Sequence, residues 1–177
     1  MDFILEERVE KARDLFRQGY NCSQSVFLAY NDLLGVESTL AATISGPLGG
    51  GMGRLREVCG AVSGMSLIAG FLAPCPDPAV RQAKAATYAL VQEFAERFRA
   101  ENGAIVCREL LGITTGAPLS PTPEARTENY YKKRPCPEIV REAAAIYCDH
   151  LCGVSFRGDD GDENADGSGK GNRDKNG

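Results

Sequence analysis

Apolar residues recur along most of the chain at intervals of three and four positions, the spacing that places them on one face of an α-helix. We expect helices over residues 2–18, 21–34, 56–72, 77–101 and 137–151, with short helical segments after Ser38 and over 105–111. No stretch alternates between apolar and polar residues with a period of two, so no strand is expected. The pattern predicts an all-α fold, a single-domain helical bundle of five or six helices.

Residues at the expected helix ends support these boundaries. Gly19 stands where the first helix would stop, because glycine takes the left-handed cap conformation without strain. Asn21 and Gln24 then have the spacing of a capping box at the start of the second helix. Gly35 is expected to end that helix, and Gly103 the long helix over 77–101.

The stretch from residue 58 to residue 76 contains no charged residue and is expected at the centre of the protein. Gly60 and Gly64 lie four positions apart in it, on one helix face, where the missing Cβ lets another backbone come close. Two interpretations are open for Cys59, which directly precedes Gly60. It is either a buried thiol in tight helix packing, or it lies in a small-walled chamber that admits another thiol, a metal or a cluster.

Charge and size limit the function classes. The chain has 177 residues and a net charge of −4, and we expect a helical domain over 1–156 followed by a disordered acidic, glycine-rich tail over 157–177. A nearly neutral, slightly acidic body has no positive surface to bind phosphates, so nucleic-acid binding is not expected.

The expected cellular compartment decides whether the cysteines are expected as disulfides or as free thiols. The N-terminus lacks the basic start and long apolar run of an export signal. Glycine and serine dilute the uncharged stretch over 58–76, so no membrane span is expected. We therefore expect a cytoplasmic, reducing location, where the seven cysteines are thiols, reactive groups or metal ligands instead of a disulfide framework.

Four cysteines have sequence contexts that suggest chemistry. Cys22 and Cys136 are expected at helix starts, where the helix dipole would favour a thiolate and depress the thiol pKa. Each could also be only a small residue tolerated there. Cys59 has the small-walled setting described above, and Cys107 lies near the start of a short helix, where a buried apolar role is an alternative.

The other three, Cys75, Cys148 and Cys152, are interpreted as structural. No pair has the C-x-x-C spacing of zinc ribbons or thioredoxin-type motifs. Any site must therefore be assembled by the tertiary fold from separate helices.

The glycine-rich segment 46–53 lacks both the Lys-Ser/Thr ending and the preceding strand of a phosphate-binding loop. It could instead bring backbone N–H groups onto a thiolate or a cluster sulfur. On this interpretation Gly49, Gly50, Gly51 and Gly60 contact the cofactor.

Several segments together resemble one known family. They are GYNCSQ from Gly19, GGGMGR from Gly49, CGAVSG from Cys59, CRELLG from Cys107, and Cys136. This combination resembles the C-GCAxxG-C-C family, whose members are described as redox-active proteins with four characteristic cysteines. The resemblance implies that Cys22, Cys59, Cys107 and Cys136 are the redox-active or metal-ligating thiols. An iron–sulfur centre has been associated with related domains.

Three functional hypotheses follow. The leading one is electron transfer by an iron–sulfur or other metal centre held by the four cysteines. The second is a thiol–disulfide oxidoreductase without metal, in which Cys59 or Cys22 attacks a disulfide. The third is a zinc-stabilised helical interaction module. Whether the protein is an enzyme, which redox partner it meets and whether it forms a homo-oligomer are left open by the sequence.

Overall fold

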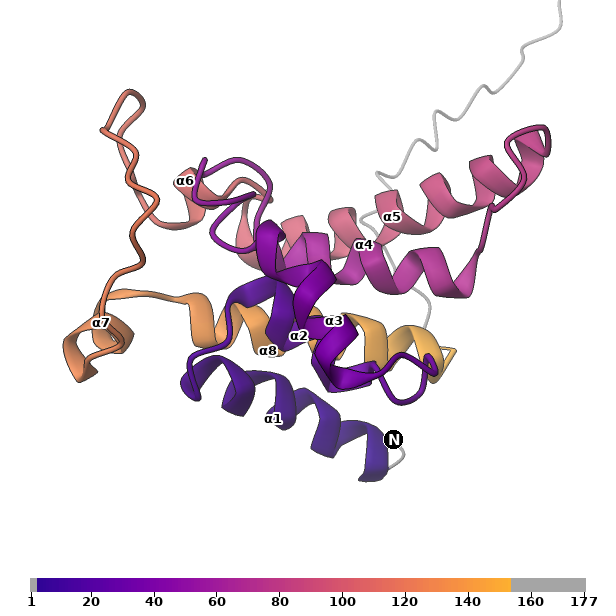
Figure 1. Ribbon diagram of the computed structural model, residues 1–177, viewed down its shortest axis with the longest axis horizontal. Helices are drawn as coiled ribbons and strands as arrows, with labels where there is room; N and C mark the ends of the chain where they lie inside the picture. Colours follow the sequence, from indigo (N-terminus) through magenta and orange to yellow (C-terminus); the bar gives the residue numbers. More distant parts are fainter. Residues whose placement is uncertain (1–2, 154–177) are drawn as a thin grey trace, which may run out of the picture.

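The computed structural model describes residues 3–153, and these form eight α-helices and one short 3-10 helix (Figure 1). In chain order they are α1 (Phe3–Arg17), α2 (Cys22–Tyr30), α3 (Ser38–Ser45), η1 (Gly46–Leu48), α4 (Gly60–Leu72), α5 (Arg81–Asn102), α6 (Cys107–Leu110), α7 (Glu128–Lys133) and α8 (Cys136–Leu151). Within this part of the chain no strand forms, so the all-α class is confirmed. The expected number of five or six helices is wrong.

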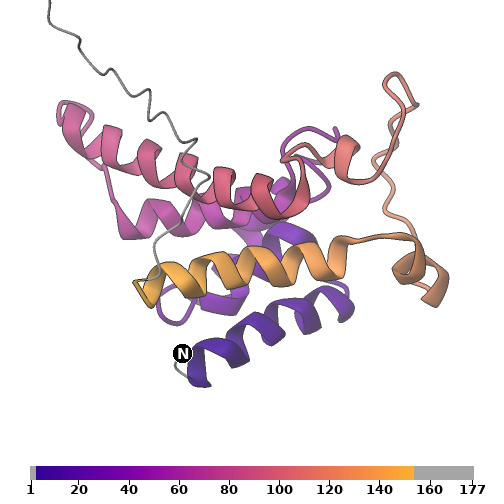
Figure 2. The ribbon, with the colours of Figure 1, turned by 180° about the vertical axis from the view of Figure 1, so that it is seen from behind.

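Helix α2 occupies the middle of the bundle. Helices α1 and α8 lie side by side on one side of it, and α4 and α5 form a second pair on the other (Figures 1 and 2). Helix α2 contacts α1, α3, α4 and α8, and eight of its nine residues are buried. The core is therefore centred on α2 as well as on the glycine-rich α4.

Gly35 was expected to end the second helix, but α2 ends at Tyr30 with Asn31 as its C-cap. The other capping signals operate as expected. Asn21 accepts a hydrogen bond from the Gln24 backbone N–H, and the Gln24 side chain accepts one from the Asn21 backbone N–H, both at 3.0 Å. Gly19 follows α1 with φ +109°, and Gly103 caps α5 in the left-handed conformation. These interactions are local in sequence, which is why the sequence alone predicts them.

A group of aromatic rings joins α2, α5 and α8. The rings of Tyr30 and Tyr147 meet edge to face with centroids 4.5 Å apart, and Phe94 packs on Tyr147 at 6.3 Å. The Tyr30 hydroxyl donates a 2.8 Å hydrogen bond to the carbonyl of Ala144. Because this polar group is satisfied, the tyrosine can be fully buried at low cost.

The uncharged stretch over 58–76 is only partly central. Helix α4 begins at Gly60, later than the expected start near residue 56, and its first ten residues are mostly buried. Gly70, Phe71 and Leu72 are exposed, because α4 and the start of α5 project beyond the rest of the bundle (Figure 1). No helix in the described part of the chain is long and apolar enough to cross a membrane.

The sequence did not predict α7. It follows a long loop over 113–127 and is capped by the Thr127 side chain, which accepts a hydrogen bond from the Tyr130 N–H. Its six residues are too few to display a helical period. The tail expected over 157–177 lies outside the described residues.

Candidate functional site

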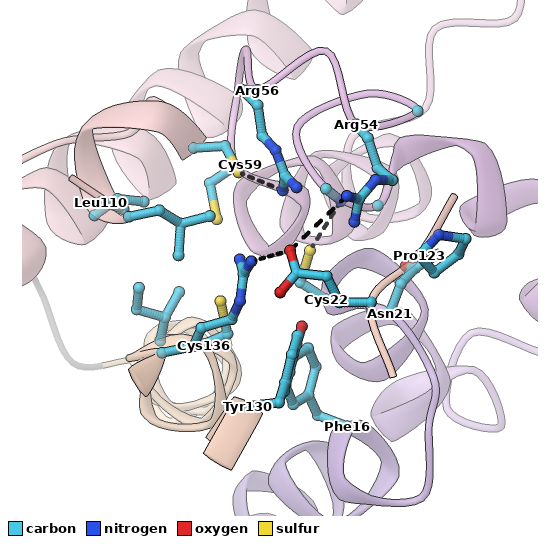
Figure 3. A pocket seen from close by; sticks show the side chains of 18 of the residues that line it. Phe16, Asn21, Cys22, Arg54, Arg56, Cys59, Leu110, Pro123, Tyr130 and Cys136 are labelled. Atoms are coloured by element: carbon cyan, nitrogen blue, oxygen red, sulfur yellow. Dashed lines mark hydrogen bonds and ion pairs between the residues drawn. The ribbon is translucent and has the colours of Figure 1, made fainter. Parts of the chain in front are cut away.

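The four predicted cysteines all stand at helix N-termini. Cys22, Cys107 and Cys136 are the first residues of α2, α6 and α8, and Cys59 is the N-cap of α4. All four line one cavity of about 260 Å³ (Figure 3). The fold thus brings together residues that are dispersed over 115 positions of the chain, from 22 to 136.

These thiols are shielded from solvent. Cys22, Cys59 and Cys107 are buried and Cys136 is half-buried. None of the described cysteines is in a disulfide. The three cysteines interpreted as structural do not line the cavity: Cys75 lies in the turn between α4 and α5, and Cys148 and Cys152 lie at the far end of α8.

The expectation that helix N-termini depress the thiol pKa values is wrong for Cys22 and Cys136. Burial raises the pKa of Cys22, with an opposing but smaller effect of the Gly50 N–H. Burial also raises the pKa of Cys136 to about 11 and that of Cys59 well above the ordinary value. The loss of hydration outweighs the helix dipole, so without a bound cation these three thiols are protonated at neutral pH.

The glycine-rich loop before α4 adopts an unusual backbone. Every residue from Gly50 to Arg54 has a positive φ, between 55° and 70°, and so has Arg56 at 64°. For residues with a Cβ this conformation costs about 1 kcal/mol or more each. Such strain is concentrated at functional sites, where the surrounding structure maintains it.

The four glycines expected to contact a cofactor divide into two groups. Gly49 and Gly50 line the cavity, and the Gly50 N–H points to Cys22 Sγ at 3.5 Å. Gly51 and Gly60 instead pack against the cysteines: a Cβ on Gly51 would lie 2.7 Å from Cys107 Cβ, and one on Gly60 would lie 2.4 Å from Cys22 Sγ. Their role is to let the thiols approach the loop closely.

The cavity also carries positive charge that the sequence analysis did not predict. Four arginines line it, Arg54, Arg56, Arg126 and Arg134, with Glu124 as the one carboxylate among the lining residues. Arg134 and Arg54 both form ion pairs with Glu124, the second with an Nη2–Oε1 distance of 3.9 Å. Arg56 is buried and donates a long hydrogen bond of 3.9 Å to Cys107 Sγ.

For two of these arginines, Arg54 and Arg134, the sequence gives a signal. Arg54 ends the GGGMGR segment that carries the family resemblance, and Arg134 precedes Cys136 by two residues. Arg126 and Glu124 lie in the loop over 113–127, and only the tertiary fold brings them to the thiols.

Aromatic rings close one side of the cavity. The Arg126 guanidinium lies over the rings of Phe16 and Tyr130, 4.3 Å and 4.7 Å from their centroids, and Arg134 lies 4.9 Å from the Tyr130 centroid. Phe16 and Tyr130 are labelled in Figure 3. Such contacts hold guanidinium groups at a partly desolvated wall without removing their charge.

The arrangement of the thiols matters for metal chemistry. Among residues 3–153, no group of three or more His, Cys, Asp or Glu side chains is arranged to hold a metal ion. The cavity therefore offers four thiols around a shared space, and not a ready-made site for a single ion.

Comparison with known proteins places this site in a family. No curated protein and no solved structure gives a significant match to the chain. A family model described as "Putative redox-active protein (C_GCAxxG_C_C)" matches residues 20–150, a span that contains all four cavity cysteines. The chain belongs to this family.

Proposed function

We propose that Cys22, Cys59, Cys107 and Cys136 form a redox centre that holds an iron–sulfur cluster and transfers electrons. The observation that carries this proposal is the convergence of four thiols, each from a different helix N-terminus, on one cavity. Four cysteine thiolates are the usual ligand set of [2Fe–2S] and [4Fe–4S] clusters. When bound, such a cluster supplies reversible electron uptake and release.

The charges of the cavity favour an anionic centre. A cluster with four thiolate ligands is negatively charged overall, and the cavity lining has four arginines against one glutamate. The N-termini of α2, α4 and α8 add positive partial charge at Cys22, Cys59 and Cys136. Because coordination deprotonates a thiol, the raised pKa values lower the apparent affinity at any pH below the thiol pKa, and this cost grows as the pH falls.

Hydrogen bonds to sulfur would adjust the reduction potential. The Gly50 N–H lies 3.5 Å from Cys22 Sγ and an Arg56 N–H lies 3.9 Å from Cys107 Sγ. Donors to ligand sulfur stabilise the more negative, reduced state and thereby raise the potential.

Thiol–disulfide exchange without metal is the second candidate. It is favoured by the lack of a preformed site for one ion among the described residues, since disulfide chemistry requires thiols only in pairs. Against it, burial raises the pKa of Cys22, Cys59 and Cys136, and the nucleophile in exchange is the thiolate.

A zinc-stabilised interaction module has less support. A tetrahedral zinc ion with bonds of about 2.3 Å needs its sulfur ligands about 3.8 Å apart. In the part of the chain described here, no three such side chains are arranged in that way. A cluster joins sulfurs that are further apart, because its ligands bind different iron atoms.

The test is the iron, zinc and acid-labile sulfide content of protein purified without oxygen, together with its absorption spectrum. We expect iron and sulfide in similar amounts and sulfide-to-iron charge-transfer bands. Cys59→Ser should lose most of the iron and the bands. Cys75→Ser is the matched control and should keep both, because Cys75 lies outside the cavity.

Two outcomes would overturn the cluster. One is protein that contains no iron and forms no bands after incubation with iron and sulfide. The other is equal iron in the Cys59→Ser and Cys75→Ser variants. If the metal-free protein instead forms a disulfide between cavity cysteines under mild oxidation, the second candidate replaces the first.

A further inference from the structure

We propose that the cavity contains a binding site for the carboxylate of a small organic acid, formed by Arg54 and Arg134 beside the thiols. In the free protein this site is occupied by the chain's own Glu124. The proposal goes beyond the redox centre and does not depend on which centre the cysteines hold.

Glu124 occupies the position that a bound carboxylate would take. Its Oε1 pairs with both Arg134 and Arg54, which approach it from the turn between α7 and α8 and from the left-handed loop. The Arg134 hydrogen bond holds the pKa of Glu124 below its usual value, so the group is an anion. Half of the Glu124 side chain is exposed, whereas those of Arg54 and Arg134 are 21% and 15% exposed. The arginines are thus part of the wall, and the carboxylate is the more accessible partner.

The cavity has more cationic groups than Glu124 can neutralise. Neither Arg56 nor Arg126 forms an ion pair with a described carboxylate. The Nη1 atom of Arg126 is buried and has no hydrogen-bond partner. Leaving a buried donor of a charged group without a partner destabilises the free protein. An oxygen of a bound anion could accept a hydrogen bond from this donor and satisfy it.

The segment that carries Glu124 is held by few interactions. Residues 118–125 are all exposed. Ser120 is anchored by its carbonyl, which accepts a 2.7 Å hydrogen bond from Arg54 Nε, and Arg126 donates a 3.3 Å hydrogen bond to the carbonyl of Tyr20. No helix is part of this segment, so it can move away from the cavity without disturbing the bundle.

The lining indicates the chemical class of the ligand. Guanidinium groups match the planar geometry of carboxylates. The lining also includes the apolar side chains of Leu110, Leu111 and Ile139. A cavity of about 260 Å³ lined by both cationic and apolar side chains fits a short organic acid, which would be held next to the four thiols.

The experiment measures the binding of butyrate by NMR titration, with butyramide as the uncharged probe of the same shape. We compare the natural protein with Glu124→Gln, and with Glu128→Gln as the matched control, because Glu128 is exposed on α7 and does not line the cavity. We expect Glu124→Gln to bind butyrate at least about fivefold tighter, since the apparent affinity rises with the fraction of protein whose site is free. Glu128→Gln should match the natural protein.

Equal butyrate affinity in all three proteins would overturn the proposal. So would equal binding of butyramide and butyrate by Glu124→Gln, since that would show an apolar pocket only.

A second measurement uses the unmodified sequence in case the variant does not fold. Saturating butyrate should shift the backbone amide resonances of Thr122, Glu124 and Ala125 relative to butyramide or chloride at equal ionic strength, and unchanged resonances would also contradict the proposal. Neither measurement depends on iron content, so its outcome is separate from that of the proposed cluster.

Discussion

At the scale of single residues, the left-handed loop makes a sharp prediction about glycine. Gly51 and Gly53 have φ of +70° and +55°, so alanine strains the backbone at both positions. Only at Gly51 does a Cβ also clash, 2.7 Å from Cys107 Cβ and 2.8 Å from the Glu57 nitrogen, whereas at Gly53 the nearest atom lies 3.8 Å away. We expect Gly53→Ala to lower the free energy of unfolding by about 1 kcal/mol, and Gly51→Ala by at least about 3 kcal/mol. Urea unfolding measures both, and equal losses would contradict this account of the loop.

The raised thiol pKa values predict a distinctive pH dependence. An ordinary exposed thiol has a pKa of about 8.5, so its alkylation rate levels off above about pH 9. Burial raises the pKa of Cys136 to about 11, so in metal-free protein its rate should continue to increase up to that pH. Alkylation followed by peptide mass spectrometry measures each site. A Cys136 rate that levels off below pH 9 would show that the helix N-terminus, and not burial, dominates.

This residue also shows where sequence reasoning fails. The position of Cys136 at a helix start was predicted from neighbouring prolines, because capping depends on adjacent residues. The direction of its pKa shift was predicted wrongly, because desolvation depends on how completely other segments cover the thiol. No local pattern in the sequence contains that information.

At the scale of elements, α1 is tied to the C-terminal end of α2 by an ion pair that responds to pH. Arg8 binds Asp32 through two hydrogen bonds, of 2.6 Å and 2.8 Å, and these lower the pKa of Asp32 to about 2. An aspartate with a depressed folded-state pKa stabilises the fold fully above its unfolded pKa of about 3.9, and this stabilisation is lost as the pH falls toward 2. Asp32 is more than half exposed, so solvent screening limits the contribution to about 1 kcal/mol.

We therefore expect Asp32→Asn to be less stable than the natural protein by about 1 kcal/mol at pH 7. The difference should shrink between pH 4 and pH 2. Chemical unfolding at several pH values measures it. Glu128→Gln is the control: its ion pair with Lys132 joins two largely exposed side chains, and the loss should not exceed a few tenths of a kcal/mol. A difference for Asp32→Asn that stays constant down to pH 2 would contradict the assignment.

The elements differ in how well the sequence predicts them. The positions of α2 and α5 were predicted because apolar periodicity and end signals, the capping box of α2 and Gly103 after α5, agree. The short helix α7 and the course of the loop over 113–127 were not predicted. Ion pairs from Glu124 in that loop to Arg54 and Arg134 hold it in place, and no local sequence pattern shows them. The candidate site accordingly divides in two: its thiols were predicted, and its arginines and glutamate were not.

At the scale of the whole molecule, burial is unevenly distributed along α5. Its buried residues, Phe94, Arg97 and Phe98, all lie in the C-terminal half. In its N-terminal half Tyr88 is 60% exposed, and Phe71 and Leu72 at the end of α4 are exposed as well. Helices α4 and α5 lie side by side (Figure 2). The cavity lined by the four cysteines lies at the opposite end of this projecting pair, beside the N-terminus of α4.

This distribution predicts a gradient of local stability. Regions with few buried apolar contacts open at lower free energy than the core. Amides in the first three turns of α5 should therefore exchange with deuterium faster than those after Phe94, and α2 should be the most protected helix. Hydrogen exchange resolved by residue, at dilute protein concentration, measures this order. Equal protection along α5 would contradict the gradient. Neither result alters the position of the four thiols, because α2 and the N-termini of α4 and α8 belong to the buried half of the bundle.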